Sequence, residues 1–451
     1  MATSSRTTRL VLKGPAHSTV KVRARRLLRL TALAGSAVLA LAACAGGSVA
    51  EPDDAIKRGD GSFVQLSVAD ATATESVRTA TRSLGLGLIA QFPGETVVTS
   101  PASAVVALSM LGTGSTGATD EQLASLLGAS GKDRDEAVNA LMGTLDPYRT
   151  DPKSIDPEEL PEEPALHMAN QVVVHETLTV EPNYLDNLSK LYDAGVLTAD
   201  LESPESKKIL DEWVRRNTAE LIKESAIEPR PDLRMVLQNA VLFAARWSTP
   251  FEEKDTYAED FTVADGTIVS ADFMHGTRTI DYAEVSGWQM IDLSYGSQKN
   301  LAARYVLPPD GTDVEAATPE ILESLESSLA PVPVRISIPK LDLVSKLDLI
   351  DPLKELGLVA VFDDNPPALQ HISTEAILVV TDAFQQGRIR LDEEGTVAAA
   401  VTEIAIAEAA APLEDPDAIE FRANRPHLIL LLDKDVSWDL FQIAVNDPTA
   451  K

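Results

Sequence analysis

The stretch that decides the fold runs Leu391-Asp-Glu-Glu-Gly-Thr-Val-Ala-Ala-Ala-Val-Thr-Glu-Ile-Ala-Ile-Ala-Glu-Ala-Ala-Ala411. Its alanines favour a helix, but Gly395 and the interspersed β-branched residues disfavour a stable one. Every second residue from Thr396 to Ile406 is small or apolar, and the alternate face tolerates water at Glu403. This alternation, with no proline, suits a strand inside a sheet. Residues 412–417 are rich in proline and acid, which is typical of exposed loop. The sequence therefore predicts a segment that is a loop in one state and a strand in another.

Composition and charge limit the class of protein. The chain of 451 residues is 44% hydrophobic, which is ample for a buried core, so wholesale disorder is excluded. Its 39 basic and 69 acidic residues give a net charge of −30. The first 29 residues hold eight of the basic residues and no acid, which leaves a net charge of −38 on the rest. Such a surface repels nucleic acid and anionic lipid, so we expect no nucleic-acid partner.

The N-terminus has the form of an export signal. Basic residues up to Arg29 precede an apolar run, residues 30–43, that is too short to span a membrane. The run ends in Leu41-Ala-Ala-Cys44, which resembles the lipobox of bacterial lipoproteins, where the cysteine is lipidated and becomes the mature N-terminus. We therefore expect residues 1–43 to be a signal peptide and the exported protein to sit on the extracellular face of the cell membrane. The alternative is cleavage after Ala42, which would give a secreted protein with a free thiol. Because Cys44 is the only cysteine, a disulfide within the chain is excluded.

The remaining chain predicts one domain. Residues 44–62 are rich in glycine, serine and acid and predict a flexible tether, which leaves 63–451 as a single domain. Helix signals cluster in the first half, such as Ser100 in an N-cap position before Pro101. Strand signals cluster in the second half, and no βαβ repeat or solenoid period is present. The pattern favours an α+β fold with a large antiparallel or mixed sheet over a doubly wound fold.

Two local signals add detail. Thr119 with Gln122 is similar to a capping box at the start of a helix that ends at Gly128. Residues 151–164 are dense in proline and acid and predict an exposed insertion.

Six short blocks follow one another in order between about residues 77 and 448. They are Thr99-Ser-Pro-Ala-Ser103, Gly114-Ser-Thr-Gly-Ala-Thr119, Asn239-Ala-Val-Leu-Phe-Ala-Ala-Arg-Trp-Ser-Thr-Pro-Phe251, Ile338-Pro-Lys340, Glu393-Glu-Gly-Thr-Val-Ala-Ala-Ala400 and Phe421-Arg-Ala-Asn-Arg-Pro426. Each is similar to a block of the serpin family, and the fifth resembles that family's loop hinge. Any one block is weak evidence, but six in order make the chain resemble a serpin over nearly all of its predicted domain.

The resemblance implies a fold and an activity. The fold would be serpin-like, with three β-sheets, eight or nine helices and an exposed reactive-centre loop at about residues 393–420. The activity would be irreversible inhibition of serine proteases: the protease forms an acyl-enzyme with the loop, and the cut loop inserts as a strand of the central sheet. The protein would then be no enzyme, need no cofactor or metal, and act as a monomer.

The resemblance also assigns the hinge of the loop. Its residues are Glu393, Glu394, Gly395, Thr396, Ala398, Ala400 and Thr402. Small side chains at the even positions ease the parting of the sheet, whereas a proline or a charge there would let the acyl bond be hydrolysed first. As a strand, Thr396 to Ala409 would span roughly 46 Å, so the loop needs an unusually tall sheet.

Counting along the loop as in the family puts the scissile bond at Ala409–Ala410. The bait region is then Glu408, Ala409, Ala410 and Ala411. These small residues suit a protease with a shallow specificity pocket, either elastase-like or subtilisin-like. No lysine or arginine lies between Ala398 and Ile419, so a trypsin-like target is disfavoured.

Further residues correspond to the family's shutter, where the central strands part, and to its breach, where the hinge enters. The shutter residues are Ser100, Ser103, Asn239 and Gln385, and the breach residue is Trp247. Gln385 stands where the family often has histidine; glutamine forms hydrogen bonds but does not titrate, so a pH-sensitive shutter is not expected. Three of these positions also have simpler interpretations: Ser100 as a helix cap, Asn239 as a buried asparagine with its hydrogen bonds satisfied, and Trp247 as an ordinary core residue.

Two other functions remain open from the sequence. A non-inhibitory serpin would act as a lipid-anchored binding protein, and bulky or charged even positions in the hinge would favour it. An enzyme would need a site, and the chain has no HExxH, GxSxG or P-loop motif.

Overall fold

The computed structural model describes residues 56–60, 62–156, 160–298, 300–364, 367–397 and 417–450. The predicted signal peptide with Cys44, the later hinge residues Ala398, Ala400 and Thr402, and the bait residues 408–411 lie outside this part of the chain.

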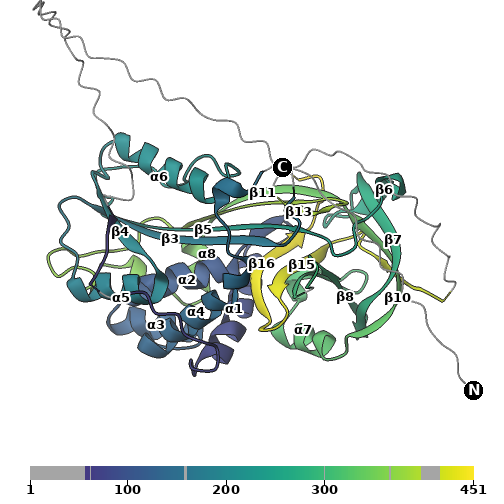
Figure 1. The fold of residues 1–451 in the computed structure, drawn as a ribbon, viewed down its shortest axis with the longest axis horizontal. Helices are drawn as coiled ribbons and strands as arrows, with labels where there is room; N and C mark the ends of the chain where they lie inside the picture. The colour runs from purple at the N-terminus through teal and green to yellow at the C-terminus, as the bar shows by residue number, and fades with distance from the viewer. Residues whose placement is uncertain are drawn as a thin grey trace, which may run out of the picture. The chain divides into compact units, whose positions relative to one another are not determined.

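Helices in the described part gather mainly on one face of a sheet. They are α1 (Thr74–Ile89), α2 (Pro101–Gly112), α3 (Gly117–Leu127), α4 (Gly131–Thr144), α5 (Pro182–Tyr192), α6 (Glu205–Asn217), α7 (Pro319–Glu326) and α8 (Ile350–Glu355). Helices α1 to α5 lie below the long strands in Figure 1, and α6 covers the opposite face. Ser100 caps α2 as predicted: its side chain accepts a hydrogen bond from the Ser103 N–H, and Pro101 takes the first helical position. Among the described residues no helix is both long and apolar enough to cross a membrane.

The first sheet contains seven strands in the order β1-β4-β3-β5-β13-β12-β11. Their bounds are β1 (Ile56–Lys57), β4 (Gly195–Ala199), β3 (Ala165–His175), β5 (Met235–Arg246), β13 (Gly395–Val397), β12 (Phe384–Leu391) and β11 (Leu341–Asp348). Only the β3–β4 pair is parallel. The central strand β5 is twelve residues long, about 40 Å at the usual rise, which is long for a strand and would accommodate about twelve of the fourteen loop residues.

The other strands form one hydrogen-bonded network. Its order is β14 (Ile419–Arg422), β10 (Ala330–Pro339), β7 (Ile268–Val285), β8 (Trp288–Ser294), β9 (Leu301–Leu307), β15 (His427–Asp433), β16 (Trp438–Val445) and β2 (Val97–Thr99), with β6 (Thr256–Thr262) paired to β7. The two further sheets that were expected run into one another along β7, because this strand of 18 residues pairs with β10 and β6 at one end and β8 at the other. Every residue of β15 and β16 is buried, so these strands form the centre of the core. The predicted α+β class is confirmed.

Three local predictions need correction. Thr119 lies inside α3 instead of capping it, since the helix starts at Gly117, and Gln122 accepts hydrogen bonds from the backbone of Val359 and Ala360. The predicted insertion at 151–164 is not simply exposed, because Leu160 and a second apolar side chain of this segment are buried in a small cluster. The folded part starts before the predicted end of the tether, because β1 already pairs with β4.

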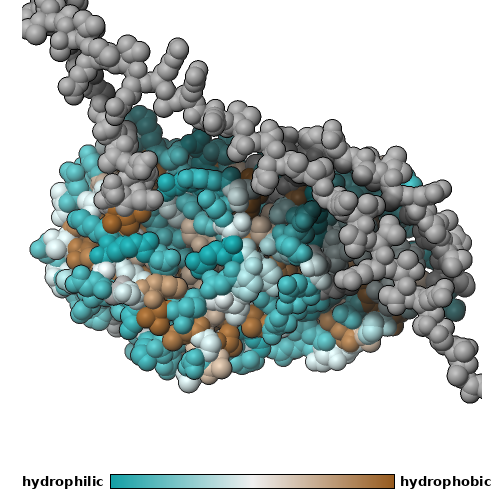
Figure 2. Space-filling model, in the orientation of Figure 1, coloured by the Kyte–Doolittle hydropathy of each residue, from teal (hydrophilic) through white to brown (hydrophobic). Residues whose placement is uncertain are grey.

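The surface agrees with the acidic composition. The face in Figure 2 is mostly hydrophilic where described residues form it, with several small hydrophobic patches. The predicted hinge, shutter and breach residues that the structure describes lie in or next to the seven-stranded sheet.

Candidate functional site

The hinge is already part of the sheet. Residues Gly395–Val397 form β13 between β5 and β12, with Thr396 opposite Ala245 of β5 and Leu391 of β12. Gly395 is required here, because a Cβ atom at this position would lie 2.1 Å from the Ala245 carbonyl oxygen. The first residues of the predicted two-state segment therefore adopt the strand state at the top of the sheet.

A tight turn delivers the hinge to this position. The Asp392 carboxylate accepts hydrogen bonds from the Glu394 N–H (3.1 Å) and the Gly395 N–H (3.4 Å). Between them Glu393 is buried and forms an ion pair of 2.7 Å with the Lys340 ammonium. Burial by itself raises the pKa of Glu393, but the hydrogen bonds from Lys340, Thr256 and the backbone together with the charge of Lys340 outweigh it, so the pKa lies below its usual value. The carboxylate stays charged and holds the turn against β10 and β11.

Two stacked aromatic rings support the hinge from below. Trp247 donates its indole N–H to the Asp392 carbonyl (2.9 Å) and its backbone N–H to the Glu394 carbonyl (2.8 Å). Its ring stacks on Tyr295 with centroids 4.5 Å apart, and the Tyr295 hydroxyl hydrogen-bonds the Thr396 hydroxyl at 2.6 Å. Burial raises the pKa of Tyr295, so this hydroxyl stays neutral. Trp247, the predicted breach residue, therefore contacts the turn that leads into the hinge.

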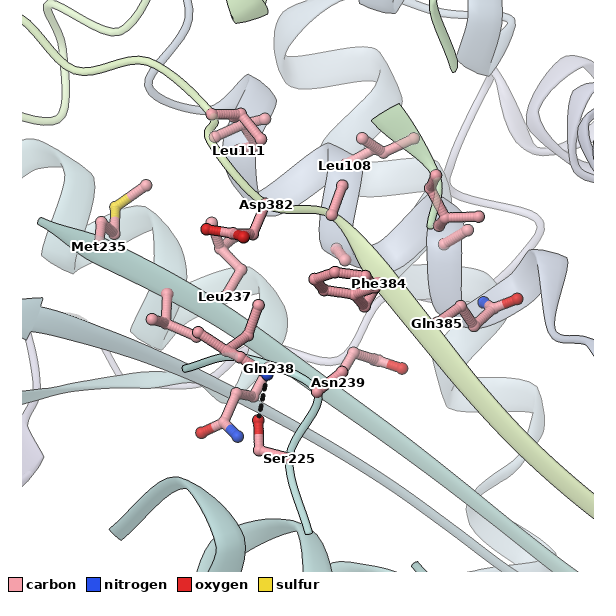
Figure 3. Close-up of a pocket in the computed structure, with 18 of the residues that line it drawn as sticks. Leu108, Leu111, Ser225, Met235, Leu237, Gln238, Asn239, Asp382, Phe384 and Gln385 are labelled. Carbon is pink, nitrogen blue, oxygen red and sulfur yellow. Dashed lines mark hydrogen bonds between the residues drawn. The ribbon is translucent and has the colours of Figure 1, made fainter. Parts of the chain in front are cut away.

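Below the hinge the two central strands are not paired with each other. In the described residues β5 pairs with β3 and β13, and β12 pairs with β11 and β13, but no pairing joins β5 to β12. A cavity of about 250 Å³ lies between them, and Figure 3 shows side chains of both strands facing it. It is lined by Met235, Leu237, Asn239 and Val241 of β5, Phe384 and Gln385 of β12, and Leu108 and Leu111 of α2. We call this gap, bounded by β5, β12 and β13, the slot.

The slot lies in line with the hinge and is lined mainly by apolar side chains. Along β5, residues 235, 237, 239 and 241 are only partly buried although three of them are apolar, while the alternate residues, such as Val236 and Ala240, are buried. A second cavity of about 40 Å³ carries the gap upward to Thr396. Because β13 is antiparallel to both neighbours, its backbone points straight into the slot. The arrangement can accept an extended chain continuing from Val397.

The predicted shutter residues meet beside the slot in two hydrogen-bonded groups. In the first, Ser103 donates its hydroxyl to the Asn239 side-chain carbonyl, and the Asn239 amide donates to Asn170 of β3 (2.5 Å). In the second, the Gln385 carbonyl accepts from the Thr99 hydroxyl (2.6 Å), and its amide donates to the Ser100 carbonyl (2.8 Å). Gln385 therefore keeps the hydrogen bonds expected of it without a titratable group.

The comparison with protein families decides the classification. The family model described as Serpin (serine protease inhibitor) matches residues 79–448. The chain belongs to the serpin family. It is 28% identical to Serpin-Z7 of Hordeum vulgare over 367 residues, which cover 78% of this chain and 90% of that relative. It is 31% identical to Serpin A3-6 of Bos taurus over 291 residues, which cover 63% of this chain and 68% of that one.

Solved structures confirm the serpin fold. Tengpin, a thermophilic serpin, in its native state superposes with a TM-score of 0.72 at 23% identity, covering 87% of this chain and 98% of that one. Thyroxine-binding globulin in complex with thyroxine superposes with a TM-score of 0.67 at 22% identity, covering 83% and 99%. At these identities the likeness concerns the fold alone.

The site of this serpin includes residues that the sequence analysis missed. Tyr295 bonds the hinge from 101 positions away, and Asn170 and Thr99 complete the two polar groups. Their only sequence signal is a polar or aromatic side chain in or next to an apolar strand, which many core positions share. No group of three or more potential metal ligands occurs among the described residues.

Proposed function

We propose that this serpin is an irreversible inhibitor of serine proteases that traps the acyl-enzyme by drawing its cut loop into the slot. The observation that carries the proposal is the slot itself: a gap between β5 and β12 in the central sheet, with Thr396 of the hinge already paired at its top. Among the described residues no ladder joins β5 to β12, so a new strand between them would gain ladder hydrogen bonds on two sides.

The register of β13 supports the proposal further. Continued beyond Val397, it would set Ala398 opposite Phe243 and Ile389, and Thr402 opposite Asn239 and Gln385. Small residues would thus enter first, and the threonine hydroxyl would reach the polar residues of the shutter.

The apolar residues of the loop suit the lower part of the slot in the same way. In this register Ile404 would face Leu237 and Ile406 would face Met235, both of which line the 250 Å³ cavity. Burying each isoleucine stabilises the inserted state by about 1.5–3 kcal/mol. The size pattern along the loop, small first and large later, therefore matches the cavity.

The target and location are part of the proposal. Alanines at 409–411 favour an elastase-like or subtilisin-like protease, with Ala409–Ala410 as the scissile bond. The lipobox-like Cys44 supports an inhibitor held on the extracellular face of the membrane, and the proposed one-to-one trapping needs only a monomer.

The test is to mix the purified serpin with pancreatic elastase or subtilisin over a range of ratios. We expect a covalent complex that survives boiling in detergent, and mass spectrometry of the released peptide should map the cut to residues 408–411. Protease whose active-site serine has been blocked is the matched control and should give no complex. If only cut serpin and fully active protease appear at every ratio with both proteases, the inhibitor proposal is wrong. A non-inhibitory binding protein then becomes the better description, as thyroxine-binding globulin with its thyroxine illustrates for a neighbour.

A further inference from the structure

The lower end of the slot is crossed by an ion pair that the predicted hinge, shutter and breach do not include. The Arg230 guanidinium donates hydrogen bonds to the Asp382 carboxylate and to the Thr381 hydroxyl, the latter at 2.5 Å. A third contact, of 2.9 Å, joins its Nε to Asp232. Arg230 lies in the segment between α6 and β5, and Asp382 lies just before β12.

The two segments meet at the same end of the slot. Strands β5 and β12 are both antiparallel to β13, so they run parallel to each other and both begin at the end farthest from the hinge. Arg230 precedes the first residue of β5 by five positions, and Asp382 precedes the first residue of β12 by two. Figure 3 shows Asp382 at this end of the cavity, across from Met235 and Leu237.

We propose that Arg230 and Asp382 form a latch that resists insertion of a strand into the lower part of the slot. This inference rests on the proposed function. A strand in the register of β13 would reach Asp382 about ten residues after its start, and a full strand holds its two neighbours roughly 10 Å apart. The ion pair must stretch or break for the strand to pass, whereas among the described residues no ion pair joins β5 to β12 nearer the hinge.

The surroundings make the latch stronger than an ordinary surface ion pair. Its side chains are 29% and 19% exposed, so the charges are partly shielded from solvent. The hydrogen bond to Asp382 raises the pKa of Arg230 despite partial burial, in agreement with a tight contact. Thr381 also donates its hydroxyl to the Asp382 carboxylate at 3.1 Å, which orients it toward the arginine.

The experiment follows spontaneous insertion of the uncut loop. Wild type and the variants Arg230→Gln and Asp382→Asn are incubated at 37 °C without protease. The fraction whose loop still accepts a cut by a trace of subtilisin is measured over time, because an inserted loop resists cleavage. We expect both variants to lose the cleavable form on the order of tenfold faster than wild type. Arg230→Lys, which keeps a cation facing Asp382 and Asp232, should retain most of the wild-type half-life.

The matched control is Arg149→Gln, which removes an exposed ion pair with Asp146 away from the slot and should change nothing. Half-lives of Arg230→Gln and Asp382→Asn within twofold of wild type would overturn the latch. The proposed function has its own readout, the melting temperature of the cut wild type. If cutting does not raise it, insertion itself fails; if it rises while the latch variants behave as wild type, only the latch is wrong.

Discussion

Replacing Thr396 with arginine tests the hinge most directly. Its side chain is 2% exposed, and its hydroxyl lies 2.6 Å from that of Tyr295, whose ring stacks on Trp247. Arginine at this position would either bury a charge without a carboxylate partner or keep β13 out of the sheet. Because β13 is the start of the inserted strand, Thr396→Arg should slow insertion without touching the bait residues.

The structure sets the size of the effect. Leaving a charge buried and uncompensated costs about 3–5 kcal/mol, which corresponds to a slowing of roughly 10²- to 10³-fold or more. Thr396→Val removes only the hydroxyl and leaves the Tyr295 hydroxyl buried without its partner. This loss destabilises the docked hinge by about 1–3 kcal/mol. Thr396→Ser keeps the hydrogen bond and should behave as wild type.

The assay is the partition between covalent complex and cut serpin on a denaturing gel at fixed protease. Hydrolysis of the acyl bond competes with insertion, so we expect complex from wild type and Thr396→Ser, a mixture from Thr396→Val, and almost only cut serpin from Thr396→Arg. Melting curves of the uncut variants show whether each one folds. A folded Thr396→Arg variant that still traps protease at a one-to-one ratio would refute the view that the docked hinge limits insertion.

Three further predictions concern the cut loop, the buried His427 and the N-terminal Cys44. A cut within 408–411 should raise the melting temperature sharply, and an unchanged melting temperature after a verified cut would contradict insertion. In the cut form, the double variant Ile404→Ala with Ile406→Ala should lose about 2–5 kcal/mol of unfolding free energy per side chain, which lowers the melting temperature by roughly 1 °C per kcal/mol in a chain of this size. His427 is fully buried, and this burial lowers its pKa to about 4, below the value of about 6.5 in the unfolded chain. As the pH falls, the unfolded state therefore binds the proton first. The contribution of His427 to the free energy of unfolding should be constant above pH 6.5 and fall by up to about 3 kcal/mol on acidification to pH 4. Denaturant titrations should show a smaller fall in stability for His427→Asn, and an equal fall would exclude this histidine as the cause. Cys44→Ser should move the protein from the membrane fraction to the medium, and retention in the membrane fraction would argue against the lipid anchor.

Much of the site could be predicted from local sequence. The alternation from Thr396 onward, the absence of proline and the glycine at 395 predicted a segment able to enter a sheet, and β13 shows its first residues doing so. Ser100 before Pro101 predicted the cap of α2 correctly, because a cap depends on neighbours three positions apart. The capping box at Thr119 was wrong because Gly117 allows the helix to start earlier and Gln122 finds backbone partners more than 200 positions away.

The sequence by itself determined the family, the strand-forming pattern of the loop and four of the polar residues beside the slot, Ser100, Ser103, Asn239 and Gln385. The tertiary structure alone decided that β5 and β12 stand apart, that Tyr295 meets Thr396, and that Arg230 meets Asp382. The physical reason is the distance along the chain over which each interaction acts. Periodicity, capping and side-chain size are set by residues a few positions apart, whereas register and ion pairing depend on which distant segments the packed core brings together.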